Sequence, residues 1–461
     1  MQQKAVTKTF WRYVIPSVAA MLVSGLYQVI DGIFVGHYIG YDGLAAINLA
    51  WPLIGIIMGL GVLIGLGAGS LISIARGEGE LAQAKRILGQ SFWLIGGLAI
   101  LIMGVVWWAA EPLLHAQKAT GDAHDFALSY LHTIALGAPL SIAAMALPML
   151  IRNDDSPALA TLLMAIGALS NVVLDYLLIV HLQWGLVGAA VATLMAQSMV
   201  ALLALFYFFS RKSLLRLSVA SLALDLSLQR KIISLGSSAM VMYLYFSFLL
   251  AVHNSLFMQY GGSVTVGAFA LIGYIMGLYY MFAEGVSSGM QPPISFAHGA
   301  GQSQMMLQIL RMGIGVVVVS GLLLVVVLNL FPQQIIALFS ADQVLQQVAV
   351  TGVHLHLWGM WLDGVLALTA VYFMSVNEAG KSLFVSLGNL AVQLPCLWLF
   401  PKLWGTTGIW LVVPISNVML CSVVLPMLWR HLAQYRQQAQ VTQPSLPLSQ
   451  AQQMVKMPLP E

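Results

Sequence analysis

Four acidic side chains interrupt the long apolar stretches of this 461-residue sequence: Asp31, Asp175, Glu284 and Asp363. An ionised side chain near the centre of a bilayer costs about 2.5–3.5 kcal/mol even on insertion scales. Because no Lys or Arg falls well inside the same stretches, we expect the four acids to face an aqueous cavity, to be protonated or to bind a cation. At any one position, a neutral carboxylic acid that hydrogen-bonds a neighbouring helix is the structural alternative.

The sharpest arrangement is the pair Asn171 and Asp175, whose i,i+4 spacing places both on one face of a helix. Asp31 is predicted to lie at a comparable depth, near the outer end of the first apolar stretch. Two carboxyl groups close together in a low dielectric disfavour simultaneous ionisation, so a proton can bind and leave there. The same oxygens, with the Asn171 carbonyl, could instead hold Na⁺, which prefers oxygen ligands. The pattern predicts a cation switch that shifts the balance between outward- and inward-open states.

The chain as a whole has the composition of a polytopic membrane protein. The chain is 60% hydrophobic and 8% charged, with a mean hydropathy of +0.89, whereas a soluble domain carries about 25% charged residues. This composition excludes a soluble enzyme, a secreted disulfide scaffold, a disordered chain and a nucleic-acid binder. Twelve apolar stretches are each long enough to cross a bilayer as a helix of about 20 residues.

The basic residues predict how these helices are oriented. Seventeen of the nineteen Lys and Arg fall on one side, which the positive-inside rule makes cytoplasmic, together with both termini. Their densest cluster marks residues 210–231 as a cytoplasmic linker. It joins an N-terminal six-helix lobe, 1–209, to a C-terminal six-helix lobe, 232–430. Residues 431–461 are predicted to form a disordered cytoplasmic tail, because the end of the chain is rich in Gln and Pro.

The two halves of the chain resemble each other. When the second half is aligned on the first, the segment ISIARGEG at 72–79 lies over ISFAHGAG at 294–301. Both halves start on the same side, which indicates parallel repeats related by an axis along the membrane normal. The predicted fold is an all-α polytopic membrane protein with twelve transmembrane helices, in two pseudo-symmetric six-helix bundles that form a V around a central cleft. In this register His253 lies opposite Asp31, and Asp175 has no acidic counterpart.

At this point the sequence resembles the multidrug and toxic compound extrusion (MATE) transporters, most closely their DinF-like bacterial and archaeal branch. The residues that carry the resemblance are Pro16 and Asp31 in the first span and the pattern Ser170-Asn171-x-x-x-Asp175 in the fifth. It covers residues 1 to about 430. The resemblance implies an N-lobe cation site of Asp31, Asn171, Asp175 and Thr193, with Tyr130 beside it, and a gating kink at Pro16. It also implies a monomer in a bacterial cytoplasmic (inner) membrane.

In the C-terminal half, Asp363 resembles the acid of the C-lobe site in the NorM-like branch. The span-seven glutamate of that branch has no counterpart here, since the polar residues of that span are His253 and Asn254. Glu284, in span eight, could compensate. The missing acid argues against a complete C-lobe Na⁺ site and favours H⁺ as the coupling ion. We expect no cofactor beyond the coupling ion, H⁺ or Na⁺.

A cluster of aromatic and Met residues around Glu284 is the candidate wall of a drug pocket. Such side chains offer flexible apolar contacts and cation–π surfaces to lipophilic cations, although packing against lipid or neighbouring helices is the alternative for each. The cluster comprises Tyr274, Met276, Tyr279, Tyr280 and Phe282.

The resemblance and the acids together predict a secondary active multidrug efflux antiporter. It would export lipophilic, often cationic small molecules through the lipid bilayer in exchange for H⁺ or Na⁺, by alternating access. A flippase for a lipid-linked oligosaccharide or another amphipathic lipid is the alternative. A pyrophosphate substrate would require Arg or Lys in the cavity, where this chain offers acids. No HExxH, GxSxG or Ser-Lys arrangement supports a membrane enzyme, and the chain is not expected to be one.

Overall fold

The computed structural model describes residues 2–117, 119, 121–338 and 342–441, and every regular element in these ranges is helical. The first half contains α1 (Gln2–Tyr38), α2 (Tyr41–Gly77), α3 (Leu81–Ala116), α4 (Asp122–Leu136), α5 (Ala138–Asn153), α6 (Pro157–Asp175), the π-helix η1 (Tyr176–His181) and α7 (Gly185–Phe209). The 3-10 turn η2 (Val219–Leu222) lies in the connection to the second half. That half contains α8 (Leu226–Gly299), α9 (Ser303–Leu330), α10 (Pro332–Ala337), α11 (Gln343–His356), η3 (Leu357–Gly359), α12 (Met360–Ser375) and α13 (Ala379–Val441).

Twelve membrane spans follow from these helices. Nine helical segments of the described residues are long and apolar enough to cross a membrane, and the pair α4 and α5, bent by 61°, supplies a tenth. The very long helices α8 and α13 each break at a glycine with positive φ, Gly262 (73°) and Gly405 (58°). Each break divides its helix into two spans, because a residue with positive φ, a conformation that favours glycine, interrupts the helix and reverses the direction of the chain. The predicted count of twelve is therefore confirmed for this part of the chain.

The same turns occur in both halves. Gly40 precedes α2 with φ 92° and corresponds to Gly262 in the register of the repeated motif. Gly185 is the first residue of α7, with φ 58°, and corresponds to Gly405 when the two halves are aligned on their Trp-Gly pairs, 184–185 and 404–405. Since only glycine adopts these angles without strain, the duplicated glycines preserve the duplicated turns.

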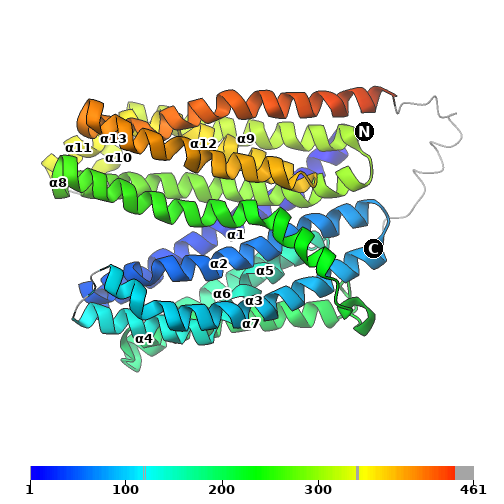
Figure 1. The fold of residues 1–461 in the computed structure, drawn as a ribbon, viewed down its shortest axis with the longest axis horizontal. Helices are drawn as coiled ribbons and strands as arrows, with labels where there is room; N and C mark the ends of the chain where they lie inside the picture. Colours follow the sequence, from blue (N-terminus) through cyan, green and yellow to red (C-terminus); the bar gives the residue numbers. More distant parts are fainter. Residues whose placement is uncertain (1, 118, 120, 339–341, 442–461) are drawn as a thin grey trace, which may run out of the picture.

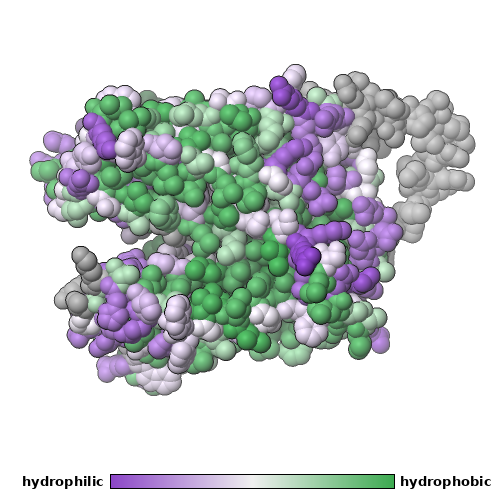
Figure 2. All heavy atoms as spheres, in the orientation of Figure 1, coloured by the Kyte–Doolittle hydropathy of each residue, from purple (hydrophilic) through white to green (hydrophobic). Residues whose placement is uncertain are grey.

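The helices form two bundles lying side by side (Figure 1). Each bundle has its own apolar core, one built mainly from α2 to α7 and the other mainly from α8 to α13. Both described ends of the chain and the α7–α8 connection lie at one end of the molecule, here called the inner end. At the opposite, outer end a notch separates the bundles, while the inner end is closed (Figure 2). This arrangement is the predicted V with a cleft between two lobes.

Two helices cross from one lobe to the other, and the sequence did not predict this. The inner half of α1 contributes Phe10 and Val14 to the C-lobe core, whereas its outer half contributes Val35 to the N-lobe core. The first span of α8 does the reverse, with Ile232 in the N-lobe core and Phe257 in the C-lobe core. The lobes therefore exchange the inner halves of their first helices, and in this part of the packing a lobe is not one continuous stretch of the sequence.

The segments outside the lobes are also ordered in part. Asp154 in the N-lobe accepts hydrogen bonds from Ser213 Oγ (2.7 Å) and the Leu215 amide (3.1 Å), which fasten the predicted linker to this lobe. Asp225 caps the start of α8 by accepting from the amides of residues 227 and 228. In the predicted tail, α13 continues as a helix to Val441. Residues 442–461 lie outside the described residues.

The repeated motif lies where the lobes meet at the inner end. A Cβ atom on Gly77 would collide with the backbone of Phe296 and Ala300, and one on Gly299 would collide with the backbone of Ile74. Gly77 and Gly299 are equivalent in the repeat, so the pseudo-twofold axis passes between them. Glycine is required there because the backbones of α2 and α8 touch directly.

This close approach predicts that Gly77→Val destabilises the protein by about 1–3 kcal/mol, since the added side chain forces two backbones apart. Gly97→Val is the matched control, because Gly97 also lies within a helix and a Cβ there meets no atom within 4 Å. Thermal unfolding of both variants in detergent measures the difference. Equal melting temperatures for Gly77→Val and Gly97→Val would contradict the assignment of this contact.

Candidate functional site

The predicted acidic pair of the N-lobe is brought together by α1 and α6. Asp31 lies in the outer half of α1, and Asp175 is the last residue of α6, where the helix passes into the π-helical turn η1. The two carboxyl groups lie next to each other. Asp175 is 0% exposed. Short π-helical segments are frequent at functional sites, because the wider turn changes the direction of the side chains.

The carboxyl oxygens of this pair lack hydrogen-bond donors. Asp31 Oδ1 and both oxygens of Asp175 are shielded from solvent and accept no hydrogen bond from a donor among the described residues. Burying an ionised carboxylate without a donor or counter-ion carries a large free-energy cost. A proton or a bound metal cation removes that cost. The geometry therefore suits a site whose carboxyl groups exchange a cation.

Asn171 and Thr193 extend the same site. Asn171 lies one turn before Asp175 on α6, and Thr193 lies on α7. Asn171 Nδ2 donates a long hydrogen bond of 3.5 Å to Thr193 Oγ1 on α7, which leaves Asn171 Oδ1 without a donor. Tyr130, from α4, is buried and lies within electrostatic range of both acids. The structure thus brings all five residues of the predicted N-lobe site together.

Tyr27 is a site residue that the sequence analysis missed. It lies one helical turn before Asp31 on α1, within electrostatic range of Asp31 and Asp175. The i,i+4 spacing of Tyr27 and Asp31 could have identified it, since residues four apart share a helix face.

A cavity of about 110 Å³ adjoins the acidic pair within the N-lobe, between α1, α2, α5, α6 and α7. Tyr27, Asn171 and Thr193 line it on the side of the acids. Its remaining wall is largely apolar and includes Met58, Met145 and Met164. The volume is sufficient for several water molecules, since one needs roughly 10–15 Å³ by this measure. None of its lining residues is Lys, Arg, Asp or Glu.

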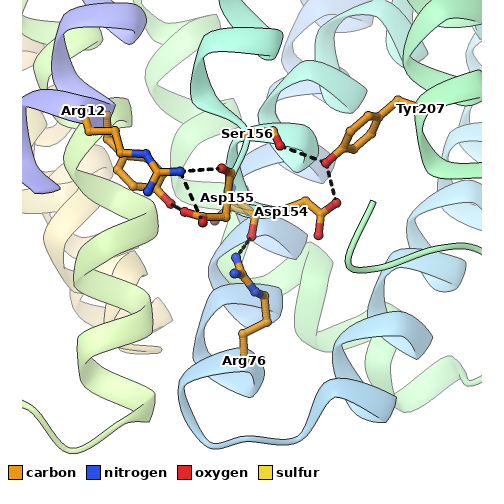
Figure 3. A network of polar contacts seen from close by, with 8 residues as sticks. Arg12, Arg76, Asp154, Asp155, Ser156 and Tyr207 are labelled. Atoms are coloured by element: carbon orange, nitrogen blue, oxygen red, sulfur yellow. Dashed lines mark hydrogen bonds and ion pairs between the residues drawn. The ribbon is translucent and has the colours of Figure 1, made fainter. Parts of the chain in front are cut away.

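Polar contacts close the inner end of the molecule (Figure 3). Asp155, in the loop between α5 and α6, accepts from Tyr13 Oη (2.5 Å) and pairs with Arg12 (3.3 Å). Arg12 and Tyr13 belong to the inner half of α1, which packs on the C-lobe. On the C-lobe itself, Gln291 Nε2 donates to Asn153 Oδ1 at 3.2 Å. These five residues, Arg12, Tyr13, Asn153, Asp155 and Gln291, are here called the inner latch.

Other contacts support the inner latch from the N-lobe side. Arg76 donates to the Asn153 carbonyl, and Ser73 Oγ donates to Asn153 Oδ1 at 2.7 Å. Tyr207 Oη donates to the Asp154 carboxylate at 2.8 Å and contacts Ser156 Oγ at 3.0 Å (Figure 3). The α5–α6 loop is therefore hydrogen-bonded to the rest of the N-lobe, and through Asp155 it also binds the inner half of α1.

A family model named MatE matches residues 16–177 and 238–399. The two matched segments are in the same register as the ISxAxGxG motifs at 72–79 and 294–301. The chain belongs to the MatE family. It is a multi-pass membrane transporter and not an enzyme, as predicted.

Relatives and solved structures agree with this MatE assignment. The multidrug export protein MepA of Staphylococcus saprophyticus is 23% identical over 410 residues, 88% of this chain and 90% of MepA. MepA of Staphylococcus aureus is also 23% identical, over 412 residues, with the same coverage. An outward-facing multidrug resistance MATE transporter superposes with a TM-score of 0.88 at 23% identity, covering 93% of this chain and 96% of the other. A MOP superfamily transporter from Pyrococcus furiosus, described as having a binding pocket of reverse polarity, superposes with a TM-score of 0.87 at 23% identity, covering 94% and 97%.

In the C-lobe of this MatE chain, the predicted polar residues do not form one site. Asp363 is buried beside Tyr280 and Asn417, and its Oδ2 has no donor among the described residues. His253 instead bonds the Leu249 carbonyl through Nδ1 (2.8 Å) and stacks on Phe269. No described interaction joins Asp363 to His253, to the half-buried Asn254 or to Glu284.

The expectation that no intramembrane acid has a cationic neighbour is wrong for Glu284. Arg152, in the last turn of α5, is only 1% exposed and lies within electrostatic range of Glu284 across the lobe boundary. The sequence analysis counted Arg152 among the seventeen basic residues on the cytoplasmic side. The structure instead buries its guanidinium group, whose nitrogens have no hydrogen-bond partner among the described residues.

The predicted aromatic and Met wall is divided in the structure. Met276 and Tyr279 belong to the C-lobe core, and Tyr279 Oη donates to the Val317 carbonyl at 3.1 Å. These two side chains are occupied by packing and do not form a free wall. Tyr274 is 61% exposed, while Tyr280 lies beside Asp363 and Phe282 is half-buried. A drug-binding role for these last three residues stays a prediction.

Pro16 lies in the middle of α1, which continues as a helix on both sides of it. The Pro16 carbonyl accepts a hydrogen bond from Thr161 Oγ1 of α6 at 2.7 Å. Proline removes one backbone hydrogen bond from a helix, which weakens it locally. The gating kink at this residue stays a prediction.

The inner latch predicts that Asp155→Asn opens the inner end more often. Asn tolerates the left-handed backbone of this residue (φ 65°) but loses the charge that pairs with Arg12. Met374, which is buried in the apolar cluster shared by the lobes, is replaced by cysteine as a reporter. This cysteine should react with a thiol reagent about fivefold faster in Asp155→Asn than in the parent protein, as expected if the closed state loses about 1 kcal/mol of stability. The native Cys396 and Cys421 are replaced by Ala in this assay.

Glu378→Gln is the matched control for this experiment, because Glu378 pairs at 3.0 Å with Lys381 inside the C-lobe. It should leave the labelling rate unchanged. Equal rates in Asp155→Asn and the parent protein would contradict the role of the inner latch.

Proposed function

We propose that this MatE chain is a secondary active antiporter that exports lipophilic, often cationic compounds in exchange for H⁺. The observation that carries the proposal is the buried pair Asp31 and Asp175, with three carboxyl oxygens that lack donors, beside a cavity in the N-lobe. The names of the two MepA relatives, both multidrug export proteins, support the same substrate class. The concentration of basic residues at the inner end supports cytoplasmic termini, and the bacterial MepA relatives support a location in a bacterial cytoplasmic membrane.

The acidic pair couples the two fluxes because it cannot favour a proton and a cationic substrate at once. When the pair is deprotonated, its negative charge attracts a lipophilic cation into the adjoining cavity, whose Tyr and Met side chains offer cation–π and apolar contacts. When a proton enters from the outer notch, it removes one of the two negative charges of the pair, and that attraction weakens. Protonation from outside therefore releases the substrate outside.

Helix α1 connects the acidic pair to the inner latch. Asp31 lies in its outer half and Arg12 and Tyr13 in its inner half, about 28 Å apart at 1.5 Å per residue. A change in charge at Asp31 alters how the outer half of α1 packs on the N-lobe, while the inner half packs on the C-lobe. The same helix thus contributes to both sites, as alternating access requires of a two-state element. Opening the inner end requires the bonds of the inner latch to break.

Sodium is the second candidate for the coupling ion. Oxygen atoms from Asp31, Asp175, Asn171 and Thr193 could surround Na⁺, which needs several oxygen ligands. We favour H⁺, because one shared proton satisfies two adjacent carboxyl groups with no further ligands. For the C-lobe acids Asp363 and Glu284, the interactions of the described residues join neither to the other, and so do not support an alternative Na⁺ site of this kind.

The flippase alternative lacks the charge that it needs. A pyrophosphate would be bound by Arg or Lys, and the N-lobe cavity has neither among its lining residues. Arg152 is buried at the lobe boundary with Glu284 as its neighbour, away from that cavity.

The proposal predicts that Asp175→Asn abolishes efflux of a cationic dye from proteoliposomes driven by a pH gradient alone. The amide cannot exchange a proton, so Asp31 is left as the single titratable group and the two residues can no longer share a proton. Asp363→Asn, the matched control in the other lobe, should retain most of the transport. The same liposomes with a Na⁺ gradient alone test the second coupling ion.

Wild-type rates in Asp175→Asn would exclude the N-lobe mechanism, and an equal loss in Asp363→Asn would assign coupling to both lobes. Size-exclusion profiles in detergent establish that both variants fold.

A further inference from the structure

A second cluster of titratable side chains lies at the outer end of the N-lobe, remote in sequence from Asp31 and Asp175. Glu111 and His115 lie in the last turns of α3, spaced i,i+4 on one face, and His124 lies in the first turn of α4. One ligand atom from each of the three residues lies within 4.8 Å of the others. The short α3–α4 connection brings these helix ends together.

The distances within this cluster fit a metal ion better than a close ion pair. Glu111 Oε1 is 3.2 Å from His115 Nε2 and 3.5 Å from His124 Nε2. Charge-assisted N–H···O bonds are typically about 2.7–2.9 Å. Two ligands at about 2.0–2.1 Å from a tetrahedral Zn²⁺ are about 3.3–3.4 Å apart. The two distances from Glu111 are therefore close to this spacing, and the two histidine nitrogens lie within 4.8 Å of each other.

His124 is oriented as a metal-ligating histidine usually is. Its Nδ1 lies 3.0 Å from the Asp125 carboxylate, a contact that makes Nδ1 the donor and leaves the Nε2 lone pair facing Glu111. The side chain is only 16% exposed, and Nε2 is shielded from solvent without a hydrogen-bond partner. This buried nitrogen is a second, independent feature that points to a ligand.

We propose that Glu111, His115 and His124 form a binding site for Zn²⁺ or a similar divalent transition metal. Two imidazoles and one carboxylate are the ligand set of borderline metals, whereas Mg²⁺ and Ca²⁺ prefer all-oxygen sites. Three protein ligands leave a fourth position to water, which the exposure of His115 and Glu111 permits. The bound metal fastens the end of α3 to the start of α4.

This connection reaches towards the N-lobe cation site. Tyr130 lies six residues after His124 on α4, about 9 Å along the helix axis. A metal at the start of α4 therefore restrains the helix that carries Tyr130. The metal site itself shares no residue with the acidic pair, so the loss of one leaves the other intact.

Isothermal titration of the purified full-length protein with Zn²⁺ in detergent at neutral pH tests the site. We expect one Zn²⁺ per chain, with binding weakened at least tenfold in His115→Ala and in His124→Ala. Asp125→Asn, which alters only the orientation of His124, should weaken binding by about 10- to 100-fold. His37→Ala and His181→Ala, which remove exposed histidines elsewhere at the outer end, are the controls and should bind as the wild type does.

Absorption spectra of the Co²⁺-loaded protein add a readout of geometry, because tetrahedral Co²⁺ absorbs far more strongly in the visible range than octahedral Co²⁺. Strong bands that disappear in His124→Ala support the site. No binding by the wild type, or equal binding by the wild type and both His→Ala variants, would show that the cluster is an ion-pair network only and would overturn the proposal.

Discussion

The N-lobe contains a pair of carboxyl groups whose buried oxygens have no hydrogen-bond donors. Each of these carboxyl groups, Asp31 and Asp175, can be neutral with a bound proton or charged beside a cation, and the proposed mechanism rests on the difference in free energy between these states. Most buried polar groups in proteins are satisfied permanently by neighbours. In the proposed mechanism a proton or another cation satisfies these oxygens, so the packing of α1 against α6 would depend on the bound ion.

The proposed mechanism requires the rest of the fold to link this site to the arrangement of the two lobes. The inner end is closed by backbone contact at Gly77 and Gly299 and by the inner latch, while the outer end is hollowed. Since α1 and the first span of α8 each pack in both lobes, neither lobe can rotate without moving them. Although each bundle has its own core, α1 and α8 contribute side chains to both cores, so the two bundles are coupled through these helices.

Much of this could be predicted from the sequence, because the bilayer imposes strict rules of length and polarity. The twelve spans follow from apolar stretches, and the association of Asp31, Asn171 and Asp175 follows from their depth and spacing. The burial of Arg152 could not be predicted, since a basic residue next to Asn153 and Asp154 resembles a loop. The exchange of α1 and α8 between the lobes could not be predicted either. An apolar pattern shows that a residue is buried, but it does not show which lobe the residue packs against. The division of the aromatic wall between core and surface has the same cause. His115 and His124 lie in separate helices, and only the tertiary structure brings them together.

Proton release on substrate binding tests the central claim most directly. Purified protein in weakly buffered detergent solution is mixed with tetraphenylphosphonium, and a pH-sensitive dye records the protons released. The account predicts release by the wild type and by Asp363→Asn, and none by the double variant Asp31→Asn/Asp175→Asn. Equal proton release by the double variant and the wild type would contradict the assignment of the coupling site to this pair.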